Sequence, residues 1–506
     1  MAADMKTLVS LLLLGLSLVT RADCKFRFAS YYGDHMVLQQ QPARAVIWGY
    51  GEPGAGLTVS LEYGVKALYA TMMTINADEG VWRVLLPAME YGGPYHLVAE
   101  QTTVKTTTIY LKDLLFGDVW LCSGQSNMEM TVKQMFNASE EMKMASNYPH
   151  IRLFTAALVQ SGTELQDLAK VDLQWSLPTA EILGHADFAY FSAVCWVFGR
   201  HLARKLKYPI GLVESSWGGT PVEAWSSKTA LKKCELFNSS DPYFDILAGP
   251  CNYSVLWNAM IHPLLNMTIK GAIWYQGEQN TGMNTDLYNC TFPALISDWR
   301  RSFHESSLGQ TDPNFPFGFV QLSTCQKSQQ KDNYPVIRWH QTADYGYAPN
   351  PRMPNTFMAV AMDLGDEASP YGGVHPRDKE TVGYRLYLGA RAIAYGDKVQ
   401  FQGPFPVRFD IYYKYLYMNI TYDQKLLIGG TCDDVFEVYC STDKGKSYKW
   451  FPIPAYSLMI SANTVTISFD GCPAVLGVRY AWDIGPANTR NVHSTVSNLN
   501  FLLLYL

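Results

Sequence analysis

Five short apolar runs, each ending in a polar or glycine-rich turn, constrain the fold of this 506-residue chain more than any other feature. They are VWLCSG, PIGLVESS, GAIWYQG, FGFVQLS and FMAVAMDLG, and longer segments compatible with helices separate them. Continuous apolar strands that alternate with helices are typical of a parallel sheet covered on both faces. Active groups in such sheets gather at the carboxyl ends of the strands. We therefore expect an α/β domain whose functional side chains follow these runs.

The segments on either side of this α/β region have a different pattern. Residues 26–110 contain short β-rich runs broken by turn signals about every ten residues, which predicts a small antiparallel sandwich. The β pattern returns after about residue 400 without a strong helical period. We therefore divide the mature chain into an N-terminal β-sandwich-like module at 23–111, a catalytic α/β domain at 112–400 and a C-terminal β-rich module at 401–506.

The first 22 residues have the layout of a secretory signal peptide. Lys6 precedes an apolar run at 8–19, and Thr20-Arg21-Ala22 approximates a small-x-small cleavage site. The run is shorter than the roughly 20 residues that a membrane-spanning helix needs, and no later segment approaches that length. We expect cleavage of residues 1–22, a mature protein that starts near Asp23, and no membrane span.

Glycosylation signals and cysteines agree with this route. Charged residues make up only 17% of the chain, and N-linked glycans on six N-x-S/T sequons would compensate as solubilising groups. The sequons are Asn137, Asn238, Asn252, Asn266, Asn289 and Asn419. Ten cysteines permit disulfides in an oxidising compartment, but their partners cannot be read from their spacing.

Two classes of partner have no support in the sequence. The net charge is −5 and no basic block is present, so we expect no nucleic-acid partner. The chain has no C-x-x-C pair and no H-E-x-x-H motif, so we expect no zinc site.

The segment GDVWLCSGQSNM carries the candidate nucleophile, Ser126. An apolar strand runs into Ser-Gly-Gln-Ser, and a helix is expected to begin at Asn127. A serine at a strand-to-helix turn stands above the sheet, with the N–H groups of the helix start facing any anion formed there. The simpler interpretation is a helix cap, and the residues after the later strands decide between the two.

Polar groups follow three later strands in an order suited to acyl transfer. PIGLVESS is followed by Gly218 and Gly219, whose backbone N–H groups can approach a ligand closely, although such a pair is more often just a tight turn. GAIWY is followed by Gln276, a side-chain amide donor. FMAVAMDLG leads to His375, which could act as general base to Ser126.

The motifs GQSNM, WGGTP, WYQGE and HPRDK, in that order, resemble those of the SGNH (GDSL-like) hydrolases, a family of serine esterases. The resemblance extends over nearly the whole mature chain, and it is greatest to the animal members that deacetylate sialic acids, which are lysosomal and secreted. It implies hydrolysis of O-acetyl esters of sialic acids or sialoglycans, with the 9-O-acetyl group as the first expected target. It implies no metal or organic cofactor.

The resemblance also assigns a role to each motif residue. Ser126 would be the nucleophile and His375 the general base. The oxyanion hole would combine the Ser126 N–H group, a backbone N–H group of the pair Gly218 and Gly219, and the Gln276 amide. Attack on an acetyl carbonyl creates a tetrahedral oxyanion, which fixed donors of this kind stabilise.

One position departs from the family pattern and leaves the third catalytic member open. Many members carry an aspartate three residues before the histidine, whereas this chain has Gly372. Asp363 and Asp366 are possible substitutes, and we favour Asp366 because it is nearer His375 along the loop. A dyad whose histidine is held by a backbone carbonyl is equally open.

Two other functions remain possible for the chain, and three further residues have an expected role. The rivals are an acetylesterase for other acetylated sugars and a glycan-binding protein on an inactive hydrolase scaffold, although the latter would need none of the motif residues. We expect His262 to be a packed structural histidine and Cys122 to be a buried thiol. His340 fits a sugar-lining role and a structural role equally well.

Overall fold

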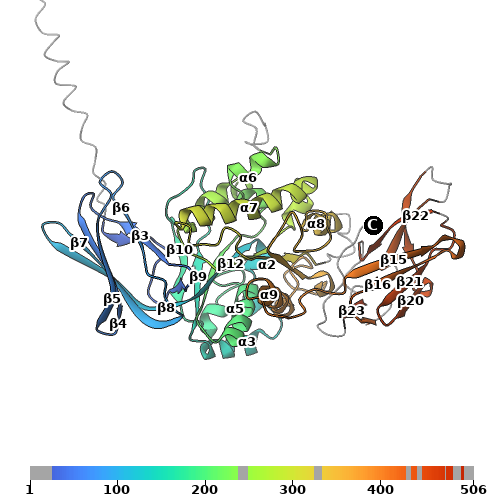
Figure 1. Ribbon diagram of the computed structural model, residues 1–506, viewed down its shortest axis with the longest axis horizontal. Helices are drawn as coiled ribbons and strands as arrows, with labels where there is room; N and C mark the ends of the chain where they lie inside the picture. Colours follow the sequence, from blue (N-terminus) through green and yellow to red (C-terminus); the bar gives the residue numbers. More distant parts are fainter. Residues whose placement is uncertain are drawn as a thin grey trace, which may run out of the picture.

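The computed structural model describes most of the mature chain. The described residues are 25–236, 249–323, 333–428, 435–441, 447–472, 474–482 and 492–494. The expected signal peptide at 1–22 and the sequon at Asn238 lie outside them. Three regions follow one another along the long axis of the molecule: an N-terminal β-rich region, a central α/β region and a C-terminal β-rich region (Figure 1). The α/β centre and its β-rich flanks were predicted.

A seven-strand stretch of sheet organises the central region, in the order β10-β9-β11-β8-β12-β13-β14. The five apolar runs form β8, β11, β12, β13 and β14, and these strands pair in parallel as predicted. The sheet as a whole is mixed, because the edge strand β10 pairs antiparallel with β9. The strands are β8 (Thr106–Gly124), β9 (Ile151–Ala156), β10 (Val171–Ser176), β11 (Ile210–Ser216), β12 (Gly271–Tyr275), β13 (Phe317–Gln321) and β14 (Thr356–Val360).

Helices cover both faces of this sheet, which explains why β11, β12, β13 and β14 are buried at every position. In Figure 1, α6 (Lys228–Lys233) and α7 (Tyr288–Ser306) lie above the sheet, and α3 (Ala138–Met144), α5 (Ala193–Leu206) and α9 (Lys379–Ile393) lie below it. Helices α5 and α9 contact each other closely at Gly383. A Cβ atom there would lie 2.6 Å from Val197 Cγ1, so a larger residue would separate the two helices.

The long strand β8 continues from the central sheet into the N-terminal region. Its first half pairs antiparallel with β7 (Gly92–Thr102), and its second half pairs in parallel with β11 and β12. The expected domain boundary at residue 111 therefore falls inside a continuous strand. The other strands here are β1 (Arg27–Phe28), β2 (Val37–Gln39), β3 (Val46–Tyr50), β4 (Gly56–Tyr63), β5 (Lys66–Thr74) and β6 (Val81–Leu85).

The C-terminal region consists of small antiparallel sheets, with strand orders β15-β16-β21-β20, β19-β18-β22 and β17-β23. Its strands are β15 (Pro406–Tyr412), β16 (Tyr417–Tyr422), β17 (Leu426–Ile428), β18 (Phe436–Ser441), β19 (Lys449–Ile453), β20 (Leu458–Ser461), β21 (Thr464–Ser468), β22 (Ala474–Tyr480) and β23 (Val492–Ser494). Among the helices of the described segments, none is long and apolar enough to cross a membrane.

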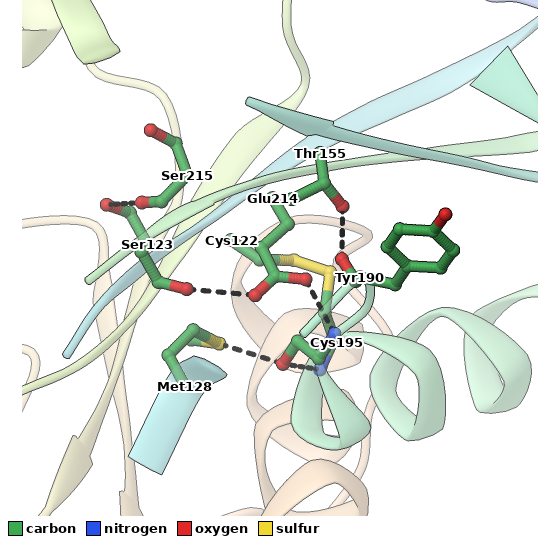
Figure 2. Close-up of a disulfide and its surroundings, with 10 residues drawn as sticks. Cys122, Ser123, Met128, Thr155, Tyr190, Cys195, Glu214 and Ser215 are labelled. Carbon is green, nitrogen blue, oxygen red and sulfur yellow. Dashed lines mark hydrogen bonds between the residues drawn. A yellow bond between two sulfur atoms is a disulfide. The ribbon is translucent and has the colours of Figure 1, made fainter. Parts of the chain in front are cut away.

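Three disulfides join segments that are distant in the sequence: Cys122–Cys195, Cys234–Cys290 and Cys440–Cys472. The first corrects the expectation of a free thiol at Cys122, because the fold brings this residue of β8 against Cys195 of α5 (Figure 2). Both cysteines are fully buried. Beside them, Ser192 donates its hydroxyl to Met128 Sδ (3.3 Å) and accepts the Cys195 N–H group (3.1 Å). The disulfide therefore braces the sheet beneath the segment that carries Ser126.

We predict that the double variant Cys122→Ala/Cys195→Ala lowers the free energy of unfolding of the α/β region. The bridge spans 73 residues, and the loop-entropy relation gives about 4 kcal/mol for such a loop. Urea denaturation followed by tryptophan fluorescence measures the change, with Cys251→Ala, which removes a free cysteine, as the matched control. A loss below about 1 kcal/mol, a small part of that entropic estimate, would contradict the structural role.

Candidate active site

Ser126 and His375 meet where β8 ends, although 249 residues separate them in the sequence. The Ser126 Oγ atom lies 2.8 Å from His375 Nε2. Strand β8 ends at Gly124, and the short helix α2 (Ser126–Glu129) begins two residues later. A Cβ atom at Gly124 would lie 2.1 Å from Tyr275 O of β12, so the strands can pair this closely only with glycine at this position. The turn then directs Ser126 away from the sheet.

A backbone carbonyl sets the tautomer of His375. Its Nδ1 atom lies 2.7 Å from Tyr371 O, and since a carbonyl oxygen only accepts hydrogen bonds, Nδ1 carries the proton. This leaves Nε2 without a proton and facing Ser126 Oγ, as a general base requires. Burial, with a smaller effect from the charge of Lys379, lowers the pKa of His375 and keeps the imidazole neutral.

The structure does not place either candidate aspartate against His375, which corrects the preference for Asp366 as the third catalytic member. Asp366 forms a bidentate ion pair with Arg377, with distances of 2.6 and 3.1 Å. Asp363 forms a similar pair with Arg385 of α9. A guanidinium fork engages both oxygens of a carboxylate, so neither aspartate is directed at the imidazole.

The glycine at the usual aspartate position has a structural reason. Gly372 has a φ of +88°, a conformation that residues with a side chain rarely adopt. The His375 N–H group donates to Gly372 O (2.9 Å), and this turn returns the chain so that Tyr371 O faces the imidazole.

Gln276 is also placed differently from the expectation. It is fully buried and lies outside the pocket around Ser126. Its Nε2 atom donates to Asn280 Oδ1 (2.7 Å) and Thr220 O (3.2 Å), and its Oε1 atom accepts the Tyr288 hydroxyl (2.9 Å). Both amide hydrogens are therefore engaged within the protein. The side chain supports the loop that contains Thr220 instead of facing a substrate.

The backbone N–H groups of Ser126 and Gly219 are candidates for an oxyanion hole, because both residues line the pocket. Among the described residues, the N–H groups of Ser126 and Gly219 have no protein acceptor, whereas Gly218 donates its own to Glu129 Oε2 (2.8 Å). Gly219 has a φ of +71° and lines the pocket. Glu129 is a pocket residue that the sequence analysis missed, and burial raises the pKa of its carboxyl group to about 7.

The pocket around Ser126 and His375 has a volume of about 490 Å³, which suits a small-molecule substrate. Gln125, Glu129, Phe188, Gly219, Glu278 and Tyr334 form much of its wall. The Phe188 ring meets the His375 ring nearly edge-on, with 5.3 Å between ring centres, and limits the positions the imidazole can take. The pocket therefore combines a paired hydroxyl and imidazole with polar and aromatic walls.

The remaining candidates lie elsewhere. His262 contacts Leu165 O through Nδ1 (2.8 Å) and the Trp257 ring, which confirms a structural role. His340 pairs with Asp344 (2.5 Å) outside this pocket. Of the described sequons, Asn137 is exposed, Asn266 is 8% exposed, and Asn252, Asn289 and Asn419 are partly exposed.

Comparisons with known proteins identify the class to which the chain belongs. The family profile "Carbohydrate esterase, sialic acid-specific acetylesterase" matches residues 116–375, and "Sialate O-acetylesterase C-terminal domain" matches residues 409–493. A solved structure, the carbohydrate acetylesterase XAC1771 from Xanthomonas citri, superposes with a TM-score of 0.77 at 27% identity, covering 95% of this chain and 99% of its own. The fold is therefore that of a carbohydrate esterase, and the chain belongs to this class.

Curated relatives narrow this class. Sialate O-acetylesterases of Pongo abelii and Homo sapiens are both 53% identical to the chain over 465 residues, which is 91% of this chain and 88% of theirs. The Mus musculus relative is 49% identical over 506 residues, or 94% of this chain and 93% of its own. The chain belongs to the sialate O-acetylesterase family and is a carboxylic ester hydrolase.

We predict that Asp366→Asn and Asp363→Asn each keep kcat within about tenfold of the wild type, about 1.4 kcal/mol. Neither carboxylate contacts His375, whereas His375→Ala removes the expected base and should lower kcat by several orders of magnitude. Steady-state kinetics of the three variants measures this difference. A hundredfold loss in a folded Asp366→Asn protein would contradict the assignment.

Proposed function

We propose that the enzyme hydrolyses O-acetyl esters of sialic acids through an acetyl-enzyme on Ser126. The observation that carries the proposal is the contact of 2.8 Å between Ser126 Oγ and the unprotonated Nε2 atom of His375. His375 takes the hydroxyl proton as Ser126 Oγ attacks the acetyl carbonyl, and returns it to the departing sugar oxygen. Water then attacks the acetyl-enzyme with the same base, which releases acetate and restores Ser126.

We assign the oxyanion hole to the N–H groups of Ser126 and Gly219, because both residues line the pocket and neither N–H group has a protein acceptor in the described segments. Two donors fixed before the reaction stabilise the developing negative charge at little reorganisation cost. Gly218 is the less suitable member of its pair, since its N–H group already donates to Glu129.

The 9-O-acetyl ester is the substrate we favour. Carbon 9 ends the exocyclic chain of a sialic acid, so its acetyl group can reach Ser126 while the sugar ring and the rest of a sialoglycan stay near the pocket mouth. The pocket of about 490 Å³ accommodates one such unit. The catalytic pair argues against a purely glycan-binding protein, which would need neither residue.

We also propose that the enzyme is secreted, lysosomal or both. The three disulfides form in an oxidising compartment, such as the lumen of the endoplasmic reticulum, through which secreted and lysosomal proteins pass. The low pKa of His375 supports a lysosomal location, because the base stays neutral when the pH falls below the ordinary histidine range.

Acetate release from a panel of sugars tests this function. The purified protein should release acetate from 9-O-acetyl sialic acid faster than from the 4-O-acetyl isomer or from neutral acetylated sugars. Ser126→Ala should lose nearly all turnover and keep its melting temperature. Substantial activity in Ser126→Ala would contradict the mechanism, and preference for neutral sugars would favour the rival acetylesterase.

The pH dependence gives a separate prediction. Because the pKa of His375 lies below its usual value, kcat/KM should be retained above that pKa and should fall only as the pH drops through it. The acid limb should therefore lie below pH 6.5, the ordinary histidine value. The variant Glu129→Gln removes a pocket carboxyl group whose pKa is raised to about 7, and it should leave this limb in place. An acid limb above pH 6.5 would contradict the assignment of His375.

A further inference from the structure

A buried polar cluster beneath the pocket joins the segments that carry the nucleophile and the base. Its centre is the side-chain amide of Asn127, which is 1% exposed and directly follows Ser126. The Asn127 Nδ2 atom donates to Val374 O (2.8 Å) and to Glu278 Oε1 (2.5 Å). The Asn127 Oδ1 atom accepts from Lys379 Nζ (2.5 Å).

The chemistry of these partners fixes the orientation of the amide. The Val374 carbonyl can only accept a hydrogen bond, and the Lys379 ammonium group can only donate. The amide of Asn127 therefore cannot flip without losing contacts on both sides. Since Asn127 neighbours Ser126 and Val374 neighbours His375, this one planar group links the two segments that carry the catalytic pair.

Lys379 is the unusual member of the cluster. It is fully buried at the start of α9, and its Nζ atom lies 5.1 Å from the centre of the Tyr275 ring. Within the described segments, no carboxylate oxygen lies within 4.0 Å of this nitrogen, so its direct polar partner is Asn127. Burying an ammonium group without a close counter-ion costs stability, which suggests that the charge serves the site.

We propose that Lys379 is a positioning residue for deacetylation, which holds the Asn127 amide in the one orientation that keeps Ser126 and His375 at hydrogen-bonding distance. The inference rests on the proposed Ser–His mechanism. Lys379 touches neither the substrate pocket nor the reacting atoms, and it acts through Asn127 and through its charge.

The charge acts on His375 in a defined direction. Burial lowers the pKa of Lys379 to about 7, against the opposing effects of Glu278, Asp378 and Asp366. Lys379 is therefore cationic in the acidic range where His375 takes up its proton, and this cation lowers the pKa of His375. Loss of the cation should raise that pKa.

Other titratable groups around the imidazole are Glu129 at the end of α2, Glu278 after β12, and Tyr371 and Tyr334 on neighbouring segments. Besides burial, the nearby charge that lowers the pKa of His375 is that of Lys379.

The experiment compares Lys379→Met with Arg385→Met. Both variants remove a buried cation from α9, but Arg385 pairs with Asp363 and lies outside the cluster. Lys379→Met should lower kcat about 100-fold, the typical cost of misplacing reacting groups by about 1 Å, with KM changed less than threefold. It should also move the acid limb of kcat/KM to higher pH. Arg385→Met should lower the melting temperature and leave the limb unchanged.

A second pair of variants keeps the test decisive if Lys379→Met does not fold. Asn127→Leu removes all three hydrogen bonds, whereas Asn127→Asp keeps the acceptor for Lys379 and loses both donors. Both should lower kcat far more than they change KM, and Asn127→Leu more strongly.

The outcomes separate this proposal from the proposed function. If Ser126→Ala is inactive while folded Lys379→Met has wild-type kcat and an unmoved acid limb, the mechanism stands and the positioning role is wrong. If the Asn127 variants alter only KM or only stability, the role of the amide in setting the catalytic distance is also wrong. Activity in Ser126→Ala would instead overturn the mechanism itself.

Discussion

The close contact between β8 and β12 at Gly124 is the constraint on which the rest of the site depends. Any side chain at Gly124 would collide with Tyr275 O, so the strands stay paired to their ends only because this residue is glycine. The chain then leaves the sheet abruptly, and Ser126 stands above the strand ends where the loops after β11 and β12 also arrive. The fully buried disulfide between Cys122 and Cys195 anchors the same strand to α5. Precision at the nucleophile therefore comes from backbone packing.

Holding His375 with a carbonyl in place of a carboxylate has a chemical consequence. The Tyr371 carbonyl fixes the tautomer as well as an aspartate would, but it brings no full negative charge to stabilise the imidazolium. Burial and the cation at Lys379 favour the neutral ring further. His375 thus stays unprotonated at lower pH than an ordinary histidine, but it is a weaker base. That balance agrees with the lysosomal location proposed above.

The sequence predicted the elements that follow from local periodicity and lost accuracy where tertiary contacts decide. The five apolar runs became parallel strands, and the fold brings Ser126 and His375, the residues expected to be nucleophile and base, into contact. The preference for Asp366 failed because Arg377, close in the sequence, takes both of its carboxylate oxygens.

The amide of Gln276 follows the expected strand, but a side chain at a strand end can turn into the core or into the pocket, and the sequence spacing does not distinguish these two directions. Lys379 was visible in the motif HPRDK, yet only the fold shows that it is buried against Asn127.

The central claim is that an acetyl group resides on Ser126 during turnover, and rapid-quench peptide mapping tests it most directly. The enzyme would be mixed with excess 9-O-acetyl sialic acid, quenched in acid within the first turnovers and digested for mass spectrometry. The account predicts a transient acetyl group on Ser126, in the peptide that contains GQSNM, absent from a parallel sample quenched before substrate is added. Acetylation of a different side chain, or release of acetate over the same quench times with no acetyl group on Ser126 at any time, would contradict it.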